Sequence, residues 1–359
     1  MTKNQNSKRY DLEKRTLKFA KEVRKMNRLI IHHWDTDGIC SAAILFESIG
    51  EEIDTRIPTI GNYYLGTEEI ADISDRGYDS IIVADMAIPE DNILQLKKES
   101  DAEIYIFDHH LQDIIDIEGV NHYNPVSMGE PIERCPSTSW ILSEYFNRRT
   151  DLLAILGAVG DNEQKIKTNQ YVFRKIERFL ENSDLTFDDL LTMVELIDSN
   201  YKIGDQEMVL NAVRFVKENH SSPKTILENK AWHQNLTNIE KEIAYQGSMP
   251  VSSSNGISTQ AIHTKYNIIS TVTRQLAWNT DSIVSIVIND GYFNTECQVY
   301  IRAGSPGINL KPVIDLAREN GYSAGGKREV AGVVLPKGET ERFIAEVTDI
   351  LSERITGTG

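Results

Sequence analysis

Residues 80–110, SIIVADMAIPEDNILQLKKESDAEIYIFDHH, decide the fold that the sequence predicts. Two apolar segments, residues 80–83 and 102–107, are each followed closely by an aspartate, and a stretch typical of a helix, residues 89–98, separates them. Short runs of Ile, Val, Tyr and Phe bounded by turn residues are typical of buried strands. The pattern predicts a βαβ unit whose charged residues gather at the carboxyl ends of its strands, the edge where open α/β sheets bind ligands.

Alternating strand and helix patterns continue on both sides of this unit and predict a parallel, doubly wound sheet. An amphipathic helix is expected over residues 11–26, where apolar residues recur at helical spacing. Further strands are expected over 29–31 and 56–60, and further helices over 39–49, 68–75, 137–146 and 152–159. Ser137 and Thr138 are expected to cap the helix that follows them.

The pattern changes after residue 165. Residues 165–240 have apolar positions at helical spacing and weak strand signals, which predicts a helical connector. The α/β pattern returns near residue 256, and an Asn-Asp-Gly turn at 289–291 predicts a hairpin, so the second sheet should be mixed. We therefore expect a catalytic domain over 1–195, a helical connector over 196–240 and a smaller mixed-sheet α/β domain over 241–359. In the last domain, strands are expected over 258–264, 283–288, 296–302 and 330–335, and helices over 269–278, 310–320 and 341–354.

Composition limits the class of protein. The 359 residues favour two domains, and 40% hydrophobic and 26% charged residues are ordinary for a globular protein. No apolar segment approaches the roughly 18 residues of a membrane-spanning helix, and residues 1–10 are polar, so we expect a cytoplasmic protein with no membrane segment. Cys40, Cys135 and Cys297 form no CxxC pair, which favours a reducing compartment and argues against a thiolate metal site.

The formal net charge of −16 limits how the chain could contact nucleic acid. A protein that grips nucleic acid non-specifically over its whole surface is basic, because it must neutralise phosphates. Any nucleic-acid contact of this chain would therefore be local, or would be bridged by bound cations.

Metal-ligand residues gather at the predicted strand ends. His33, Asp35 and Asp37 stand two residues apart, so in an extended strand end their side chains would point the same way, and Gly38 would allow a sharp turn. Asp85 and His109 follow two other strands. Together with Asp161, at the end of a predicted helix, these ligands are too many for one closed zinc site and suit two ions about 3.5–4 Å apart. Imidazole and carboxylate ligands without thiolates favour Mn²⁺, with Mg²⁺ as the substitute.

The predicted ligands lie in four short motifs. In order along the chain, these motifs resemble those of the DHH phosphoesterase superfamily: HWDTDG (33–38), VADM (83–86), FDHH (107–110) and AVGD (158–161). The segments YIRAG (300–304) and GGKREVAG (325–332) resemble the DHHA1 domain that accompanies it. The form DTDGICSA of the first motif is most similar to archaeal RecJ-like exonucleases. The resemblance implies a parallel DHH domain, a smaller DHHA1 domain and phosphodiester hydrolysis.

The resemblance to the DHH motifs implies two ion sites that share Asp85 as a bridge. The first ion would be held by His33, Asp35 and Asp85, and the second by Asp37, Asp85, His109 and Asp161. Asp108 would orient an imidazole from outside the ligand set. His110 would face the scissile phosphate as a hydrogen-bond or proton donor.

The DHHA1 resemblance implies the substrate contacts. Arg302 aligns with a phosphate-binding arginine, and Gly325, Gly326 and Gly332 would shape a backbone loop that approaches the substrate. Lys327 stands where the family has a histidine, and a lysine can bind phosphate as a point charge. Without the resemblance, Arg302 reads as a surface ion-pair residue and Lys327 as a solvated loop charge. His32 and Trp34 read as structural.

The leading hypothesis is a Mn²⁺-dependent exonuclease that releases mononucleotides from single-stranded DNA or RNA. The favoured polarity is 3′ to 5′. The strand would lie in a groove between the two domains. One alternative is a phosphoesterase for very short oligonucleotides, nucleotide bisphosphates or cyclic dinucleotides. Against it, this branch has its histidine four residues before the first aspartate, where this chain has Ile31. The other alternative is a non-catalytic scaffold in a replication complex. The resemblance also implies a replication or repair partner, such as GINS or a Hef-type helicase-nuclease.

Overall fold

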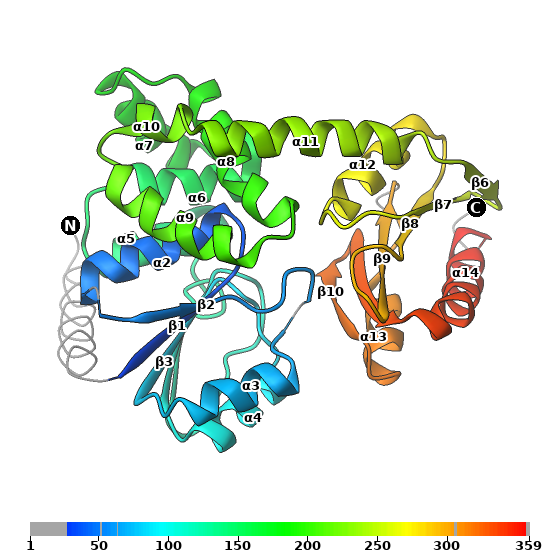
Figure 1. The fold of residues 1–359 in the computed structure, drawn as a ribbon, viewed down its shortest axis with the longest axis horizontal. Coiled ribbons are helices and arrows are strands. Elements are labelled where there is room, and N and C mark those ends of the chain that lie inside the picture. The colour runs from blue at the N-terminus through cyan, green and yellow to red at the C-terminus, as the bar shows by residue number, and fades with distance from the viewer. Residues whose placement is uncertain (1–26, 51, 63, 305–306, 357–359) are drawn as a thin grey trace. The chain divides into compact units, whose positions relative to one another are not determined.

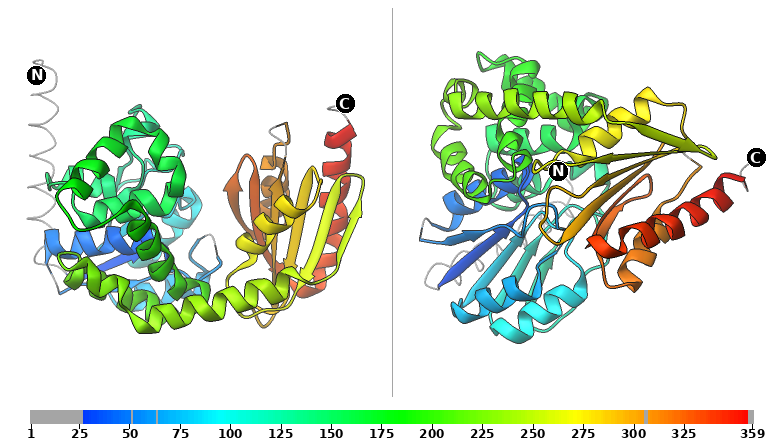
Figure 2. Two further views of the ribbon diagram at one scale, coloured as in Figure 1. Left: turned by 90° about the horizontal axis from the view of Figure 1, so that it is seen from above. Right: turned by 45° about the vertical axis from the view of Figure 1, so that its right-hand side comes forward.

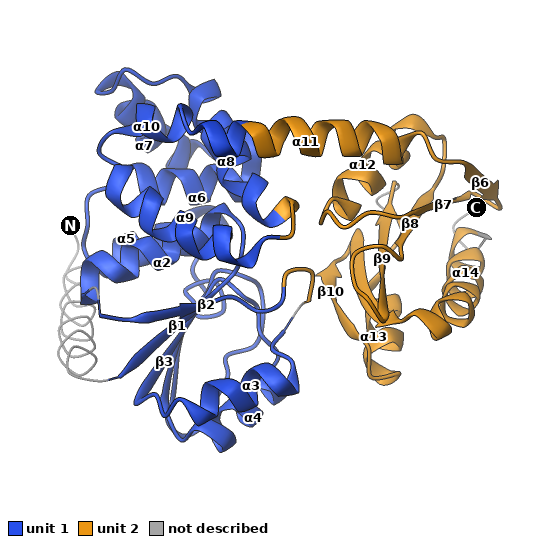
Figure 3. Cartoon of the chain, in the orientation of Figure 1, with its two compact units in different colours: residues 1–59, 64–201, 205–233 blue, residues 60–63, 202–204, 234–359 orange. Residues whose placement is uncertain are grey.

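The computed structural model describes residues 27–356 except 51, 63 and 305–306, and the chain divides into two compact units (Figure 1, Figure 3). Unit 1 comprises residues 1–59, 64–201 and 205–233, and unit 2 comprises residues 60–63, 202–204 and 234–359. The helix expected over residues 11–26 lies outside the described residues. Among the residues that are described, no helix is both long enough and apolar enough to cross a membrane.

Unit 1 is built on a parallel sheet with the strand order β2-β1-β3-β4-β5. The strands are β1 (Arg28–His32), β2 (Asp54–Arg56), β3 (Ser80–Ala84), β4 (Glu103–Phe107) and β5 (Val120–Tyr123). Every residue of β1 and β3 is buried, as expected for central strands covered on both faces. The predicted doubly wound α/β sheet is confirmed.

Helices cover both faces of this sheet, as Figures 1 and 2 show. On one face, α3 (Thr67–Asp75) and α4 (Glu90–Ser100) share an apolar core with β1, β3 and β4. The other layer contains α2 (Thr36–Ile49), α5 (Thr138–Tyr145) and α6 (Leu152–Asn162), with α2 packed against both of the others. Most of α2 is buried, because it lies between the sheet and the next helices.

The segment predicted to be helical is helical, and most of it belongs to unit 1. It contains α7 (Gln170–Glu181), α8 (Phe187–Lys202), α9 (Gln206–Asn219), α10 (Pro223–Leu227) and α11 (Lys230–Gly247), preceded by the short 3₁₀ helices η1 (Ile132–Arg134) and η2 (Glu163–Thr168). Helix α9 packs on α2, whose first turn contains the end of the first metal-ligand motif. The segment is therefore part of the packing around that motif.

Unit 2 contains a mixed sheet with the order β10-β11-β9-β8-β7-β6, as predicted. The strands are β6 (Val251–Ser254), β7 (Ile257–Ile262), β8 (Val284–Asn289), β9 (Glu296–Ala303), β10 (Ser323–Lys327) and β11 (Val330–Pro336). Strands β7 and β8 pair in parallel, and the other pairs are antiparallel. The helices α13 (Lys311–Glu319) and α14 (Thr340–Thr356) pack on one face, and α12 (Ile269–Asn279) packs on the other.

Several local features differ from the predictions. The strand expected over 56–60 lies earlier, as β2, and ends at Arg56. The sequence did not reveal β6, which reads VSSS and is exposed, or β10, which reads SAGGK. The expected glycine loop is instead a hairpin, because Gly325 pairs with Gly332 and Gly326 with Ala331 across β10 and β11.

Candidate metal centre

The HWDTDG motif forms the junction between β1 and α2. Strand β1 ends at His32, and Asp35 caps α2 by accepting a hydrogen bond from the Gly38 N–H at 3.1 Å. A Cβ on Gly38 would lie 2.1 Å from the His33 carbonyl oxygen, so this close approach requires glycine. Asp37 lies in the first turn of the helix. The prediction that His33, Asp35 and Asp37 alternate along an extended strand is therefore wrong. The first turn of α2, and not a strand, sets the position of Asp37.

Asp85 follows β3 in a backbone conformation that residues other than glycine rarely adopt. Its φ is 64°, in the left-handed region, and Ala87 has a φ of 42°. Two bonds hold this turn against β4: the Asp85 N–H donates to the Phe107 carbonyl at 3.0 Å, and the Ala87 N–H donates to Asp108 Oδ2 at 2.8 Å. Backbone strain at a buried carboxylate is characteristic of functional sites.

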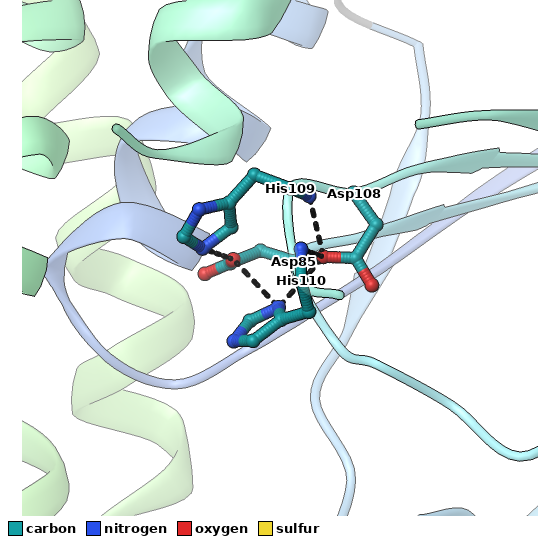
Figure 4. Close-up of side chains that lie close together, drawn as sticks. All are labelled: Asp85, Asp108, His109 and His110. Atoms are coloured by element: carbon teal, nitrogen blue, oxygen red, sulfur yellow. Dashed lines mark hydrogen bonds and ion pairs between the residues drawn. The ribbon is translucent and has the colours of Figure 1, made fainter. Parts of the chain in front are cut away.

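The residues after β4 place one carboxylate and two imidazoles beside Asp85 (Figure 4). Asp108 Oδ1 accepts hydrogen bonds from the backbone N–H groups of His109 (2.8 Å) and His110 (3.2 Å), and it lies 2.7 Å from His110 Nδ1. Asp108 therefore organises the turn and fixes the His110 ring. The His109 ring points elsewhere, towards Asp161 in the last turn of α6.

His109 provides the local test of whether this site fits a metal. Its buried Nε2 lies 2.9 Å from Asp161 Oδ2 and 3.5 Å from Asp85 Oδ1, so a protonated ring pairs with Asp161. A buried ring nitrogen that points among carboxylates, where a cation could replace its proton, fits a metal ligand.

The structure gathers the six residues predicted as metal ligands into overlapping groups whose potential ligand atoms lie within 4.8 Å of one another. One group is His33, Asp35 and Asp85, and a second is Asp37, His109 and Asp161. A third contains Asp85 and His109 together with Asp108 and His110, so it links the other two. All of these residues belong to unit 1. The donor set, imidazole and carboxylate without thiolate, suits Mn²⁺ or Mg²⁺.

The N-terminus of α5 holds two of these carboxylates, which the sequence analysis did not anticipate. The backbone N–H groups of Thr138 and Ser139 donate to the two oxygens of Asp37 at 2.6 and 2.9 Å, and Thr138 Oγ1 donates to Asp85 Oδ1 at 3.0 Å. Ser137 caps the helix through the Trp140 N–H, as predicted, whereas Thr138, which was also expected to cap it, is the first helical residue and directs its hydroxyl to Asp85. The Ser-Thr-Ser sequence signalled only the cap, because the contacts with Asp37 and Asp85 arise from the tertiary fold.

Crowded carboxylates set the electrostatics of the centre. Burial, followed by repulsion from Asp161, raises the pKa of Asp37 to about 6. Burial and repulsion from Asp37 raise the pKa of Asp85 well above its usual range. Burial alone would lower the pKa of His109, but attraction to Asp161 and other carboxylates outweighs it and raises the pKa to about 9. The cluster therefore needs positive charge, which divalent cations would supply.

His32 and Trp34 have structural surroundings. His32 is fully buried, and its Nδ1 lies 2.7 Å from the His33 carbonyl oxygen, where it helps to fix the junction. Burial lowers the pKa of His32 to about 4, so the ring is neutral at physiological pH. Trp34 is buried, and its ring lies 4.3 Å from that of His33.

The residues predicted to bind substrate lie in unit 2 and surround the glycine hairpin. Arg302, in β9, stands between Ser285 of β8 and Val330 of β11. Two residues earlier in β9, Tyr300 pairs with Gly332, which itself pairs with Gly325. These glycines leave the sheet without side chains beside Tyr300. Lys327 is exposed at the end of β10, also opposite Val330.

Comparison with known proteins adds a family for part of the chain. Residues 27–171 match the family described as "DHH family, N-terminal domain". None of the curated proteins compared with the chain matches its sequence. Among solved structures, exonuclease RecJ bound to manganese matches with 15% identity and a TM-score of 0.65, over 95% of this chain and 94% of that one.

Other solved structures share the fold. RecJ from Thermus thermophilus in complex with Mn²⁺ matches with 14% identity and a TM-score of 0.67, over 95% of this chain and 54% of that one. The same protein in complex with Mg²⁺ matches with a TM-score of 0.59 and 14% identity, over 95% and 52%. The DHH domain of a member of the s1p family of ribosomal proteins matches with 15% identity and a TM-score of 0.69, over 96% and 91%. At these identities the likeness establishes the fold alone.

Proposed function

We propose, on the premise that residues 27–171 form a DHH-family N-terminal domain on a RecJ-like fold, that this protein is a metal-dependent exonuclease. It would hydrolyse terminal phosphodiester bonds of single-stranded DNA or RNA and release mononucleotides, with a lean towards 3′ to 5′ polarity. The observation that carries the proposal is the convergence of His33, Asp35, Asp37, Asp85, His109 and Asp161 at one edge of the sheet.

The six residues would hold two ions. His33, Asp35 and Asp85 would bind the first, and Asp37, Asp85, His109 and Asp161 the second. Mn²⁺ is the proposed ion and Mg²⁺ its substitute, in line with the donor set and with the ions of the matched RecJ structures. Two such ions, when bound, supply activation of a water and neutralisation of phosphate charge.

His110 would act directly on the substrate. Its side chain is 32% exposed, and the buried Asp108 carboxylate fixes its Nδ1 at 2.7 Å. Although burial opposes ionisation, attraction to His110 and the bond with it keep the pKa of Asp108 well below its usual range, so Asp108 is an anion. Because Asp108 holds Nδ1, Nε2 is the ring nitrogen that would contact a phosphate oxygen or the leaving group.

Unit 2 would bind the strand. We propose that Arg302 binds a substrate phosphate, that Lys327 adds a second positive charge, and that Gly325, Gly326 and Gly332 let the substrate backbone come close. The hairpin supports this role, because its paired glycines present no side chains beside Tyr300.

A degradation assay tests the proposal. End-labelled DNA and RNA strands, each with a label at one end or the other, would be incubated with the protein and Mn²⁺. We expect mononucleotide products, sensitivity to EDTA, and loss of activity in Asp85→Ala, because Asp85 serves both ion sites. The control is Asp91→Asn, which removes an exposed carboxylate from α4 and should behave as wild type.

Substrate length separates the proposal from the small-substrate alternative. The exonuclease should act on strands of twenty nucleotides about as readily as on short ones, whereas cleavage restricted to dinucleotides or nucleotide bisphosphates would favour the alternative. Protein that binds Mn²⁺ but hydrolyses no phosphodiester would favour a scaffold instead.

The resemblance also motivates two broader proposals. The first is that the protein is cytoplasmic. The second is that it has a replication or repair partner, such as GINS or a Hef-type helicase-nuclease, and it would then co-purify with that partner from its native cell extract. Failure of tagged protein to retain either one, under conditions in which it retains its nuclease activity, would count against this partner.

A further inference from the structure

Asp198, in the helical segment, contacts the first metal-ligand motif directly. Its Oδ1 accepts hydrogen bonds from the Thr36 backbone N–H at 2.9 Å and from Thr36 Oγ1 at 2.7 Å. The two residues are 162 positions apart in the chain and belong to unit 1. Asp198 is not a member of any of the three potential metal-ligand groups of the described residues.

Thr36 is the residue between two proposed ligands, Asp35 and Asp37, and it is enclosed. Only 1% of Thr36 is exposed, and its hydroxyl also lies 3.4 Å from the Val194 carbonyl oxygen of α8. On another side, a Cβ added to Gly160 of α6 would lie 3.2 Å from Thr36 Cβ. Residues of α6 and α8, Asp198 among them, thus enclose the backbone that carries both carboxylates.

The contact also satisfies the start of α2. The first N–H groups of a helix have no partner within the helix, and a carboxylate near them is stabilised by the helix dipole. The Asp35 side chain accepts from the Gly38 N–H, and Asp198 accepts from the Thr36 N–H. Because Asp198 accepts from both the N–H and the hydroxyl of Thr36, the backbone at Thr36 has little freedom to move. The neighbouring residues Asp35 and Asp37 are restricted with it.

We propose that Asp198 is a positioning residue for the metal centre: through Thr36, it fixes the directions in which Asp35 and Asp37 present their carboxylates to the two ions. The inference rests on the metal site of the proposed function. It assigns α8 a part in metal binding that a connector would not have.

Direct measurement of Mn²⁺ binding tests the proposal without relying on activity. In isothermal titration calorimetry, Asp198→Ala should bind Mn²⁺ 10- to 100-fold more weakly than wild type, the loss typical when a group that orients metal ligands is removed. Thr36→Val, which loses the hydroxyl donor, should also weaken binding, whereas Thr36→Ser should restore it. Glu195→Ala is the matched control, because Glu195 is an exposed carboxylate of the same helix.

The thermal midpoint of the metal-free variants separates positioning from simple structural support. If Asp198 only anchors α8, Asp198→Ala will melt earlier without metal but bind Mn²⁺ with wild-type affinity, and that result would overturn the proposal. Should Asp198→Ala fail to fold by circular dichroism, Thr36→Val decides the matter, and wild-type Mn²⁺ affinity in that variant would overturn the proposal.

The test also separates this inference from the proposed activity. Wild-type protein that binds Mn²⁺ yet hydrolyses nothing would overturn the exonuclease proposal and leave the Asp198 comparison intact. Wild-type protein that binds no Mn²⁺ would overturn the metal site and the role of Asp198 together.

Discussion

At His109 and Asp37, proton binding competes with metal binding. The raised pKa of His109, about 9, means that the metal-free protein holds a proton there at neutral pH, and Asp37, with a pKa of about 6, retains one in mild acid. Both residues must release these protons to act as ligands. We therefore expect Mn²⁺ affinity to rise between pH 6 and pH 9 and binding to release protons, which calorimetry in buffers of different ionisation enthalpy would measure.

The same shifts predict the stability of the metal-free protein. The folded pKa of His109 exceeds its usual value of 6.5, so its contribution to stability is complete below pH 6.5 and is lost as the pH rises through about 9. The contribution of Asp37 is present below pH 3.8 and lost as the pH rises through about 6. Without metal, the free energy of unfolding should therefore fall from pH 6 to pH 9.

A Mn²⁺ affinity that did not change over this range would contradict the assignment of these two ligands.

Gly157 predicts a steric effect on the same cluster. A Cβ at this position of α6 would lie 2.0 Å from Ser139 Oγ and 2.2 Å from Asp37 Oδ1, so both side chains, or the backbone of α6, must move. We expect Gly157→Ala to lower the free energy of unfolding by about 1–3 kcal/mol, the usual cost of overpacking, and to weaken Mn²⁺ binding. Urea unfolding and calorimetry would measure the two effects. Gly338→Ala is the control, because no atom lies within 4 Å of its added Cβ.

Among the elements, α5 shows that a helix cap can serve a site. Ser137 Oγ accepts from the Trp140 N–H at 3.2 Å, and removing such a cap costs about 1 kcal/mol. Asn169 caps α7 in the same way, through the Val172 N–H. We predict that Ser137→Ala and Asn169→Ala destabilise the fold by similar amounts in urea, but that only Ser137→Ala weakens Mn²⁺ binding, because the N–H groups of α5 hold Asp37. Equal Mn²⁺ affinities in the two variants would contradict this role of α5.

The sequence predicted those parts of the fold that local patterns determine. Asp85 and His109 follow the ends of neighbouring apolar strands, which had to bring them to one edge because parallel strands share their carboxyl ends. The contacts of Thr138 with Asp85 and of Asp198 with Thr36 could not be foreseen, since they join residues 53 and 162 positions apart. Strand β10 was missed for a different reason: glycine has low strand propensity, and only pairing with β11 makes this segment a strand.

For the whole molecule, the net charge of −16 predicts that binding of the proposed nucleic-acid substrate depends on bound cations. An acidic surface repels phosphates, so EDTA-treated protein should bind single strands poorly, and Mn²⁺ should tighten binding. With His110→Ala used to limit hydrolysis while the six proposed ion ligands stay in place, adding Arg302→Ala should weaken binding further, and adding Lys337→Ala, which removes an exposed lysine of unit 2, should not. Fluorescence anisotropy with a labelled oligonucleotide would measure this. Unchanged affinity in the Arg302 variant would reject its phosphate role.

The backbone conformation of Asp85 lowers the stability of the fold at the residue that is proposed to bind both ions. A buried carboxylate that other carboxylates repel, on a residue with a φ of 64°, costs folding free energy that glycine or asparagine there would recover. A library of this gene screened only for heat tolerance should therefore discard Asp85 early, and the survivors would be sturdier and inert. Sequencing such a population would reveal whether the chain retains this aspartate for its chemistry at the expense of its robustness.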